Sequence, residues 1–166
     1  TGDLNLQARC LTYLTIFYRR RGRVAETRHT ATRALAVAAR VGMHEYDGLA
    51  KANLAWLAWT DGDWPAVEQL GQEALAAWAL TPAVVASMAF AWTAHWPLLA
   101  AAVAQRAYGR ALDHVAALLD PCLQRMPETL VAALEGARQA GVQADDAGLR
   151  TQLAGALALA QQTHFL

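Results

Sequence analysis

Apolar residues recur every three or four positions through most of this chain, which is the pattern of amphipathic helices. The stretch 48–79 shows the pattern most clearly, as two helical segments that meet at a turn around Gly62. Asp63 is placed to cap the second segment, and Pro65 falls in its first turn, where a missing N–H is tolerated. Because one such pair cannot bury its own apolar face, it predicts neighbours of the same kind.

The same periodicity predicts further helices on both sides of this pair. Their approximate bounds are 3–20, 24–39, 81–108, 110–119, 128–141 and 146–162. Candidate caps are Asp3, Gly42 and either Asp145 or Asp146. The long segment begins at Thr81-Pro82, and Pro97 inside it predicts a kink or break near residues 94–96, because proline removes one helical hydrogen bond.

Four glycines each follow one predicted helix and precede the next: Gly22, Gly62, Gly109 and Gly141. We therefore expect a single all-α domain over residues 1–166, a superhelical array of about four antiparallel helix hairpins. The expected hairpins span about 3–42, 44–79, 81–119 and 127–163. Because the chain opens on Thr1 rather than Met, we also expect it to be a C-terminal fragment of a larger protein.

Residues at fixed offsets from two of these glycines resemble the tetratricopeptide repeat (TPR). They are Leu54, Ala55 and Ala74 around Gly62, and Leu14, Tyr18 and Ala34 around Gly22. The chain departs from the repeat at Thr27, where alanine is usual, and at Gln105, where an aromatic residue is expected. The resemblance covers nearly the whole chain and implies a TPR-like superhelix.

Three further segments resemble the C-terminal helical arrays of large bacterial signalling ATPases: Trp-Pro-Leu-Leu-Ala at 96–100, Leu-Leu-Asp-Pro at 118–121 and Leu-Gln-Arg-Met-Pro at 123–127. Those proteins carry an N-terminal nucleotide-cyclase or DNA-binding domain before the ATPase. The resemblance implies a protein-interaction or regulatory scaffold module of a multidomain bacterial signalling or transcriptional regulator. A self-association module that forms a homodimer and a small-molecule sensor domain are the alternatives.

The TPR resemblance also implies that the first helix of each hairpin lines a concave groove. The residues it places in this partner-binding groove are Arg19, Arg20, Asn53, Trp56, Trp59 and Arg106. Tryptophans beside arginines suit a protein or peptide with apolar anchors and acidic flanks. The alternative is that the tryptophans fill gaps between alanine-rich helices.

Charge is distributed unevenly although the net charge is zero. Residues 1–42 hold eight arginines against two acidic residues, whereas residues 43–166 hold six basic and twelve acidic ones. The chain could thus present a basic first layer to an acidic partner or to upstream domains of the same chain, or merely a solvated surface. Because the remainder is acidic, we expect no nucleic-acid partner.

Residue types that carry chemistry are sparse, so we expect no enzyme, no cofactor and no metal. The single serine, Ser87, lies between apolar residues, and the single lysine, Lys51, follows no glycine-rich phosphate loop. The five histidines show no i, i+4 pair. Cys10 and Cys122 lie 112 positions apart, which predicts reduced, buried thiols in a cytoplasmic protein.

A run of 32 residues without charge, from Ala74 to Gln105, is long enough to span a membrane. Thr81-Pro82 interrupts the run, however, and polar residues such as Ser87 and His95 lie within it. We therefore expect a buried helix and no membrane partner.

Overall fold

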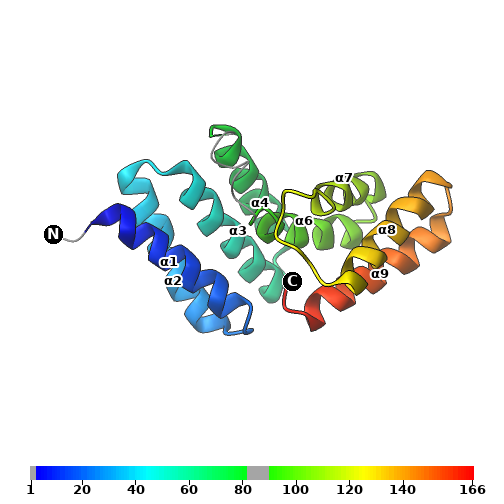
Figure 1. Cartoon of the computed structure of the whole chain (residues 1–166), viewed down its shortest axis with the longest axis horizontal. Helices are drawn as coiled ribbons and strands as arrows, with labels where there is room; N and C mark the ends of the chain where they lie inside the picture. Colours follow the sequence, from blue (N-terminus) through cyan, green and yellow to red (C-terminus); the bar gives the residue numbers. More distant parts are fainter. Residues whose placement is uncertain (1–2, 82–89) are drawn as a thin grey trace.

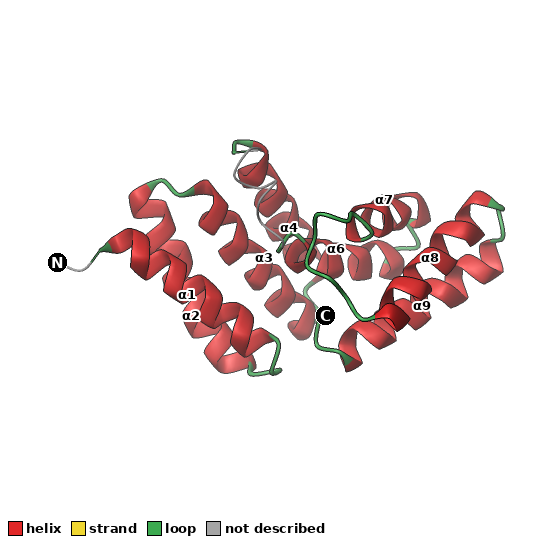
Figure 2. Cartoon of the chain, viewed as in Figure 1, coloured by secondary structure: helices red, strands yellow, loops and turns green. Residues whose placement is uncertain are grey.

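The computed structural model describes residues 3–81 and 90–166, and these form eight α-helices (Figures 1 and 2). The helices are α1 (Leu4–Arg19), α2 (Val24–Val41), α3 (His44–Asp61), α4 (Trp64–Ala79), α6 (Trp92–Ala104), α7 (Tyr108–Leu118), α8 (Glu128–Val142) and α9 (Asp146–Gln162). The all-α class predicted from the sequence is confirmed.

Helices that follow one another pack as hairpins: α1 on α2, α3 on α4, α6 on α7 and α8 on α9. The hairpins stack side by side in chain order, from α1–α2 at one end of the molecule to α8–α9 at the other (Figure 1). The first helices of the first three hairpins also contact one another in chain order, α1 on α3 and α3 on α6. The start of the expected third hairpin falls on residues 82–89, outside the described residues.

The predicted helix caps are confirmed wherever they can be observed. Asp3 accepts hydrogen bonds from two backbone N–H groups of the first turn of α1, and Asp63 accepts one from the N–H of Ala66. Asp145 accepts one from the N–H of Gly148 at 2.9 Å, so Asp145 rather than Asp146 caps α9. The caps satisfy N–H groups that have no partner inside their helices.

Two of the four predicted turn glycines are confirmed and two are wrong. Gly22 and Gly62 adopt positive φ angles of 63° and 75° in the turns that follow α1 and α3. Gly109, in contrast, lies inside α7. The left-handed residue of that turn is Arg106, with φ 57°, so the turn precedes the glycine.

Gly141 lies inside α8, and Ala144, with φ 54°, makes the turn that follows it. A Cβ at residue 141 would lie 2.7 Å from Cδ1 of Leu112 on α7. This glycine therefore permits close approach of two helices rather than a turn, and the sequence pattern alone does not separate these uses.

The core is continuous from α1 to α9 and is built from alanines, leucines and a few tryptophans. Small residues bring the helices close together, as at Gly48 of α3, where a Cβ would lie 2.7 Å from Cδ1 of Trp78 on α4. The Trp78 indole is 4% exposed and donates a hydrogen bond to the carbonyl of Glu45. The indole therefore lies in a fixed position against the glycine.

In the part of the chain that the structure describes, no helix is both long enough and apolar enough to cross a membrane.

Substituting Gly48 with alanine should destabilise the fold by about 1–3 kcal/mol, because the added methyl overlaps a rigid indole. Gly155→Ala is the matched control, since this helical glycine has no atom within 4 Å of its Cβ position. The control should be neutral or stabilise by up to about 1 kcal/mol. Urea unfolding followed by far-UV circular dichroism measures both. Equal midpoints for the two variants would contradict the close packing.

Candidate functional site

Arg19, the last residue of α1, is 1% exposed and connects four parts of the molecule. Its Nη1 donates to the backbone carbonyl of Thr93 on α6 at 2.9 Å and lies 3.4 Å from Oδ1 of Asn53 on α3. Its Nη2 donates to the carbonyl of Phe165 at 2.8 Å, in the segment that follows α9. One buried guanidinium thus holds α1, α3, α6 and the C-terminal segment together.

Pro97 explains why the Thr93 carbonyl is available. In an α-helix the carbonyl of residue 93 would accept from the N–H of residue 97, and proline has none. Arg19 supplies the missing donor, and α6 continues through Pro97 to Ala104. Of the kink or break expected near residues 94–96, the break is wrong, because α6 continues there and a tertiary hydrogen bond satisfies the carbonyl that proline leaves free.

Aromatic rings surround the two arginines at the end of α1. The Arg19 guanidinium lies 5.5 Å from the ring centroid of Trp56 and 5.1 Å from that of Trp92. The Arg20 guanidinium lies 3.9 Å from the ring centroid of Phe165. Cations above aromatic faces are stabilised electrostatically, more so when water is excluded.

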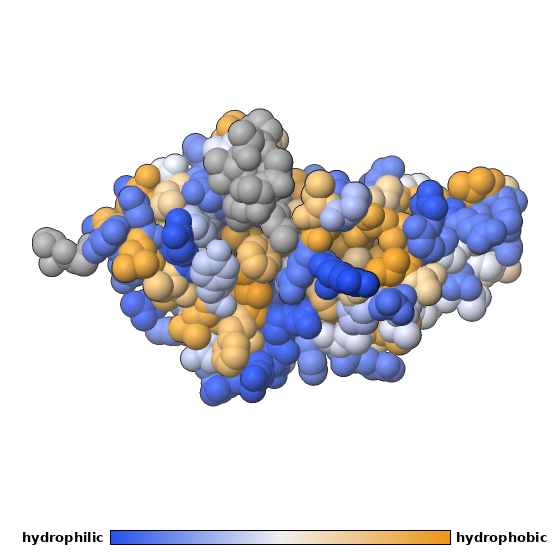
Figure 3. Space-filling view, viewed as in Figure 1, coloured by the Kyte–Doolittle hydropathy of each residue, from blue (hydrophilic) through white to orange (hydrophobic). Residues whose placement is uncertain are grey.

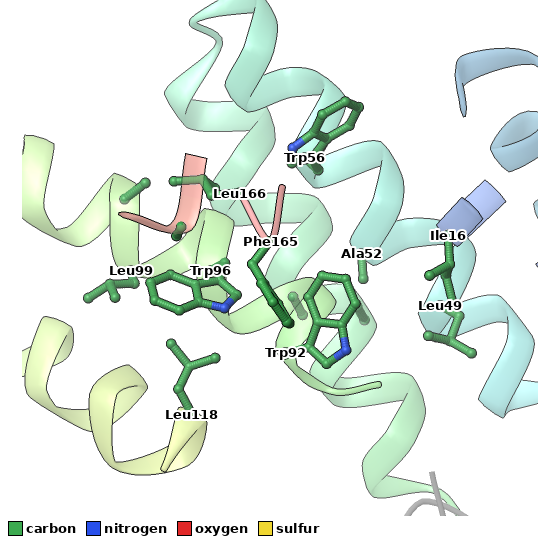
Figure 4. Close-up of a cluster of buried hydrophobic side chains, with 14 of the residues drawn as sticks. Ile16, Leu49, Ala52, Trp56, Trp92, Trp96, Leu99, Leu118, Phe165 and Leu166 are labelled. Atoms are coloured by element: carbon green, nitrogen blue, oxygen red, sulfur yellow. The ribbon is translucent and has the colours of Figure 1, made fainter. Parts of the chain in front are cut away.

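The tail, residues 163–166, places Phe165 and Leu166 among Trp56, Trp92 and Trp96 (Figure 4). After α9 the chain turns at His164, with φ 57°, and the N–H groups of Phe165 and Leu166 both donate to the carbonyl of Ala160. The Phe165 ring packs edge-on against Trp92 with centroids 4.9 Å apart. The tail consequently lies near the middle of the molecule, against the first three hairpins (Figure 1).

We call this region the Arg19 groove: Arg19, Arg20, Asn53, Trp56, Trp92 and Trp96, with the tail seated among them. Four residues proposed from the sequence, Arg19, Arg20, Asn53 and Trp56, do come together here. The expectation that Asn53 and Trp56 line an open surface is wrong, since they are 0% and 4% exposed. The tail and the neighbouring helices cover them.

The other two proposed residues lie elsewhere. Trp59 is half-buried against a small cluster that contains Ala58 and Val67. Arg106 is exposed in the turn after α6, at the end of that helix opposite Thr93. A helix of this length separates the two ends by roughly 20 Å. Neither residue contributes to the Arg19 groove.

Sequence reasoning did not place Trp92 or Trp96 in the partner-binding groove, and it missed Phe165 as part of any site. The available signal was the pair Phe165-Leu166 directly after the polar residues Gln161-Gln162-Thr163-His164. Two large apolar residues after a polar stretch indicate burial, but only the fold shows where they are buried.

The electrostatics of the groove are unusual because no carboxylate offsets its arginines. Neither Arg19 nor Arg20 pairs with any of the aspartates and glutamates, all of which lie in the described segments. Burial, and then the neighbouring charge of Arg20, lowers the pKa of Arg19 well below its usual value. Burial likewise lowers the pKa of Arg20. The two guanidinium groups therefore have no aspartate or glutamate partner, and the hydrogen-bond acceptors of Arg19 are neutral oxygens.

A second pair of titratable groups joins α6 to α7. Nδ1 of His95 lies 3.2 Å from Nδ1 of His114, so one ring donates to the other. Burial, and then the charge of His114, lowers the pKa of His95 to about 4. Burial also lowers the pKa of His114, with Asp113 and Arg110 acting in opposite directions. Both rings are neutral at pH 7.

Residues 3–81 and 90–166 contain no cluster of three or more side chains suited to hold a metal ion. The cysteines differ from expectation, because Cys10 and Cys122 are both exposed rather than buried. Each lies on the solvent side of its segment, which a scattered apolar pattern does not reveal.

Comparison with known proteins returned no relative: no family model, no curated protein and no solved structure matches this chain.

The dependence of Arg19 on Pro97 can be measured with a double-mutant cycle. Arg19→Met should cost about 2–4 kcal/mol, because the carbonyls of Thr93 and Phe165 lose their buried donor. In the Arg19→Met variant, Pro97→Ala should restore about 1 kcal/mol of the free energy of unfolding, because the new N–H donates to the Thr93 carbonyl. In the unchanged chain the same substitution should stabilise less, because Arg19 already donates to that carbonyl. Arg33→Met, at an exposed position, is the control. Additive effects in chemical denaturation would contradict this account.

The free energy of unfolding should fall as pH falls from about 6.5 to 4. In this window His95 takes up a proton in the unfolded chain, where its pKa is ordinary, but stays neutral in the folded chain, where its pKa is about 4. The loss amounts to about 3 kcal/mol at the low end. His95→Gln should flatten the profile, and His29→Gln, at an exposed site, should not. Identical profiles of urea midpoint against pH for both variants would contradict the buried neutral state.

Proposed function

We propose that this chain is a TPR-like, non-catalytic interaction module that binds a peptide segment of a protein partner in the Arg19 groove. The succession of stacked helical hairpins and the repeat-like offsets around Gly22 and Gly62 support a TPR-like assignment. The resemblance of residues 96–127 to bacterial regulators supports a regulatory scaffold in a cytoplasmic signalling or transcriptional protein. Flanking domains of the same chain are alternative sources of the segment.

One observation carries the proposal: the groove already holds a short segment of the chain itself. Phe165 contacts Trp92 and Arg20 with its ring and Arg19 with its carbonyl. An aromatic anchor combined with a backbone contact is a common way to bind a peptide. These contacts of the tail support the proposal, in which an external segment would compete with the tail for the groove.

Self-association is the second candidate, and the surface of α1 favours it. Four large side chains on one side of this helix are exposed: Leu6, Tyr13, Leu14 and Phe17. Figure 3 shows apolar surface over the part of the molecule where Figure 1 places α1. Sedimentation at several protein concentrations separates the candidates, because self-association would raise the average mass as the protein concentration increases. The sensor alternative receives no comparable support, because Phe165 and Leu166 fill the space beside Trp92 and Trp96.

Peptide binding can be tested with the tail itself. A fluorescein-labelled, C-terminally amidated peptide of residues 159–166 should bind the double variant Phe165→Ala plus Leu166→Ala. Its affinity for the unchanged protein should be at least about tenfold weaker, because the seated tail reduces the fraction of open groove. Fluorescence anisotropy measures both.

Two controls accompany this titration. Leu80→Ala plus Val142→Ala removes two exposed apolar side chains outside the groove and should behave as the unchanged protein. A peptide with alanine in place of its phenylalanine should not bind. If the tail variant remains folded by circular dichroism and binds no peptide, the proposal fails.

A further inference from the structure

Four buried N–H donors around the tail have no acceptor in the described parts of the chain. They are Nε of Arg19, Nη1 of Arg20, Nε1 of Trp56 and Nε1 of Trp96. Trp56 and Trp96 lie on opposite sides of Phe165 and Leu166 (Figure 4), and both arginines contact Phe165. Buried donors without acceptors are rare and costly, so their concentration in one place calls for an explanation.

All four groups donate, and two of them carry positive charge. The acceptors that the chain provides to Arg19 are two backbone carbonyls and one amide oxygen, none of which is charged. A carboxylate would form shorter and stronger bonds with a guanidinium than these neutral oxygens do. It would also offset the charges of Arg19, which is buried, and of Arg20 beside it, which is partly buried.

No aspartate or glutamate of this chain fills that role as the molecule is folded, since none pairs with Arg19 or Arg20. The residues outside the described segments, 1–2 and 82–89, contain no aspartate or glutamate. A side-chain carboxylate for these arginines must therefore come from another molecule or from a segment beyond these 166 residues.

The tail is suited to be exchanged. It consists of the four residues after α9, and its N–H groups donate only to carbonyls in the last turn of that helix, those of Leu159, Ala160 and Gln161. Its contacts across the groove are the Phe165 carbonyl and two apolar side chains. An incoming segment that reproduces the ring of Phe165 and adds a carboxylate would gain bonds that the tail lacks.

We propose that the partner segment of the Arg19 groove carries an aromatic residue followed directly by an acidic one, and that Phe165-Leu166 occupies its place in the unbound protein. The aromatic ring takes the position of Phe165 between Arg20 and Trp92. The carboxylate takes the position of Leu166, one residue after the carbonyl and the ring that Arg19 and Arg20 contact. This inference rests on the proposed peptide-binding function and specifies its ligand.

The preference for a carboxylate can be tested with three peptides based on residues 159–166. Each is labelled at its N-terminus and amidated at its C-terminus, and they end in Phe-Leu, Phe-Asp or Phe-Asn. Asp and Asn have the same shape, so their difference reports charge alone. The receptor is the full chain with Phe165→Ala plus Leu166→Ala. The Phe-Asp peptide should bind at least about tenfold more tightly than the Phe-Asn peptide at low salt. This ratio should shrink as salt is added.

Arg20→Gln in the same receptor should abolish the preference for Asp over Asn, whereas Arg33→Gln, at an exposed position, should leave it unchanged. If Arg20→Gln does not fold, the salt titration of the Asp to Asn ratio decides instead. Equal affinities of the Asp and Asn peptides overturn the carboxylate inference while leaving peptide binding intact. Absence of binding by all three peptides overturns the proposed function as well.

Discussion

The buried guanidinium of Arg19 is the interaction on which the arrangement of the four hairpins depends. A charge taken out of water is tolerated only if its surroundings provide acceptors in the right directions. This chain provides them from three places distant in sequence: Asn53, Thr93 and Phe165. Because a guanidinium donates in a fixed plane, these acceptors must lie at defined positions around the end of α1.

Two features that would weaken an isolated helix make this possible. Pro97 removes a hydrogen bond from α6 but leaves the Thr93 carbonyl for Arg19. Asn53, a polar residue in the middle of α3, donates to the carbonyl of Leu49 and directs its oxygen toward Arg19. Each is unfavourable by local helix propensity and favourable in the folded chain, which is typical of residues selected by tertiary context.

The tail changes the character of the array. Stacked hairpins normally contact only their neighbours in sequence. Here Phe165, after the last helix, contacts Arg19 and Arg20 at the end of the first. The chain's own tail thereby covers the Arg19 groove, which joins the last hairpin to the first three.

The amino-acid sequence by itself determined most of the helices, most of their caps and their pairing, because these follow from local periodicity and from side chains adjacent to the helix ends. It did not give the bounds of α6, since the helix expected over 81–108 is observed as Trp92–Ala104 after a turn at residues 90–91. It also indicated that Arg19, Arg20, Asn53 and Trp56 belong to one region. It misplaced two turns. Gly109 and Gly141 lie inside helices, and the chain turns at Arg106 and Ala144 instead.

Only the tertiary structure decided that this region is buried, that Trp59 and Arg106 lie outside it, and that His95 meets His114. The physical reason is that the burial of a helix face, and the contacts made across it, depend on which other segment of the chain packs on that face. Residues up to 146 positions apart, such as Arg19 and Phe165, leave no periodic signal of their contact in the chain.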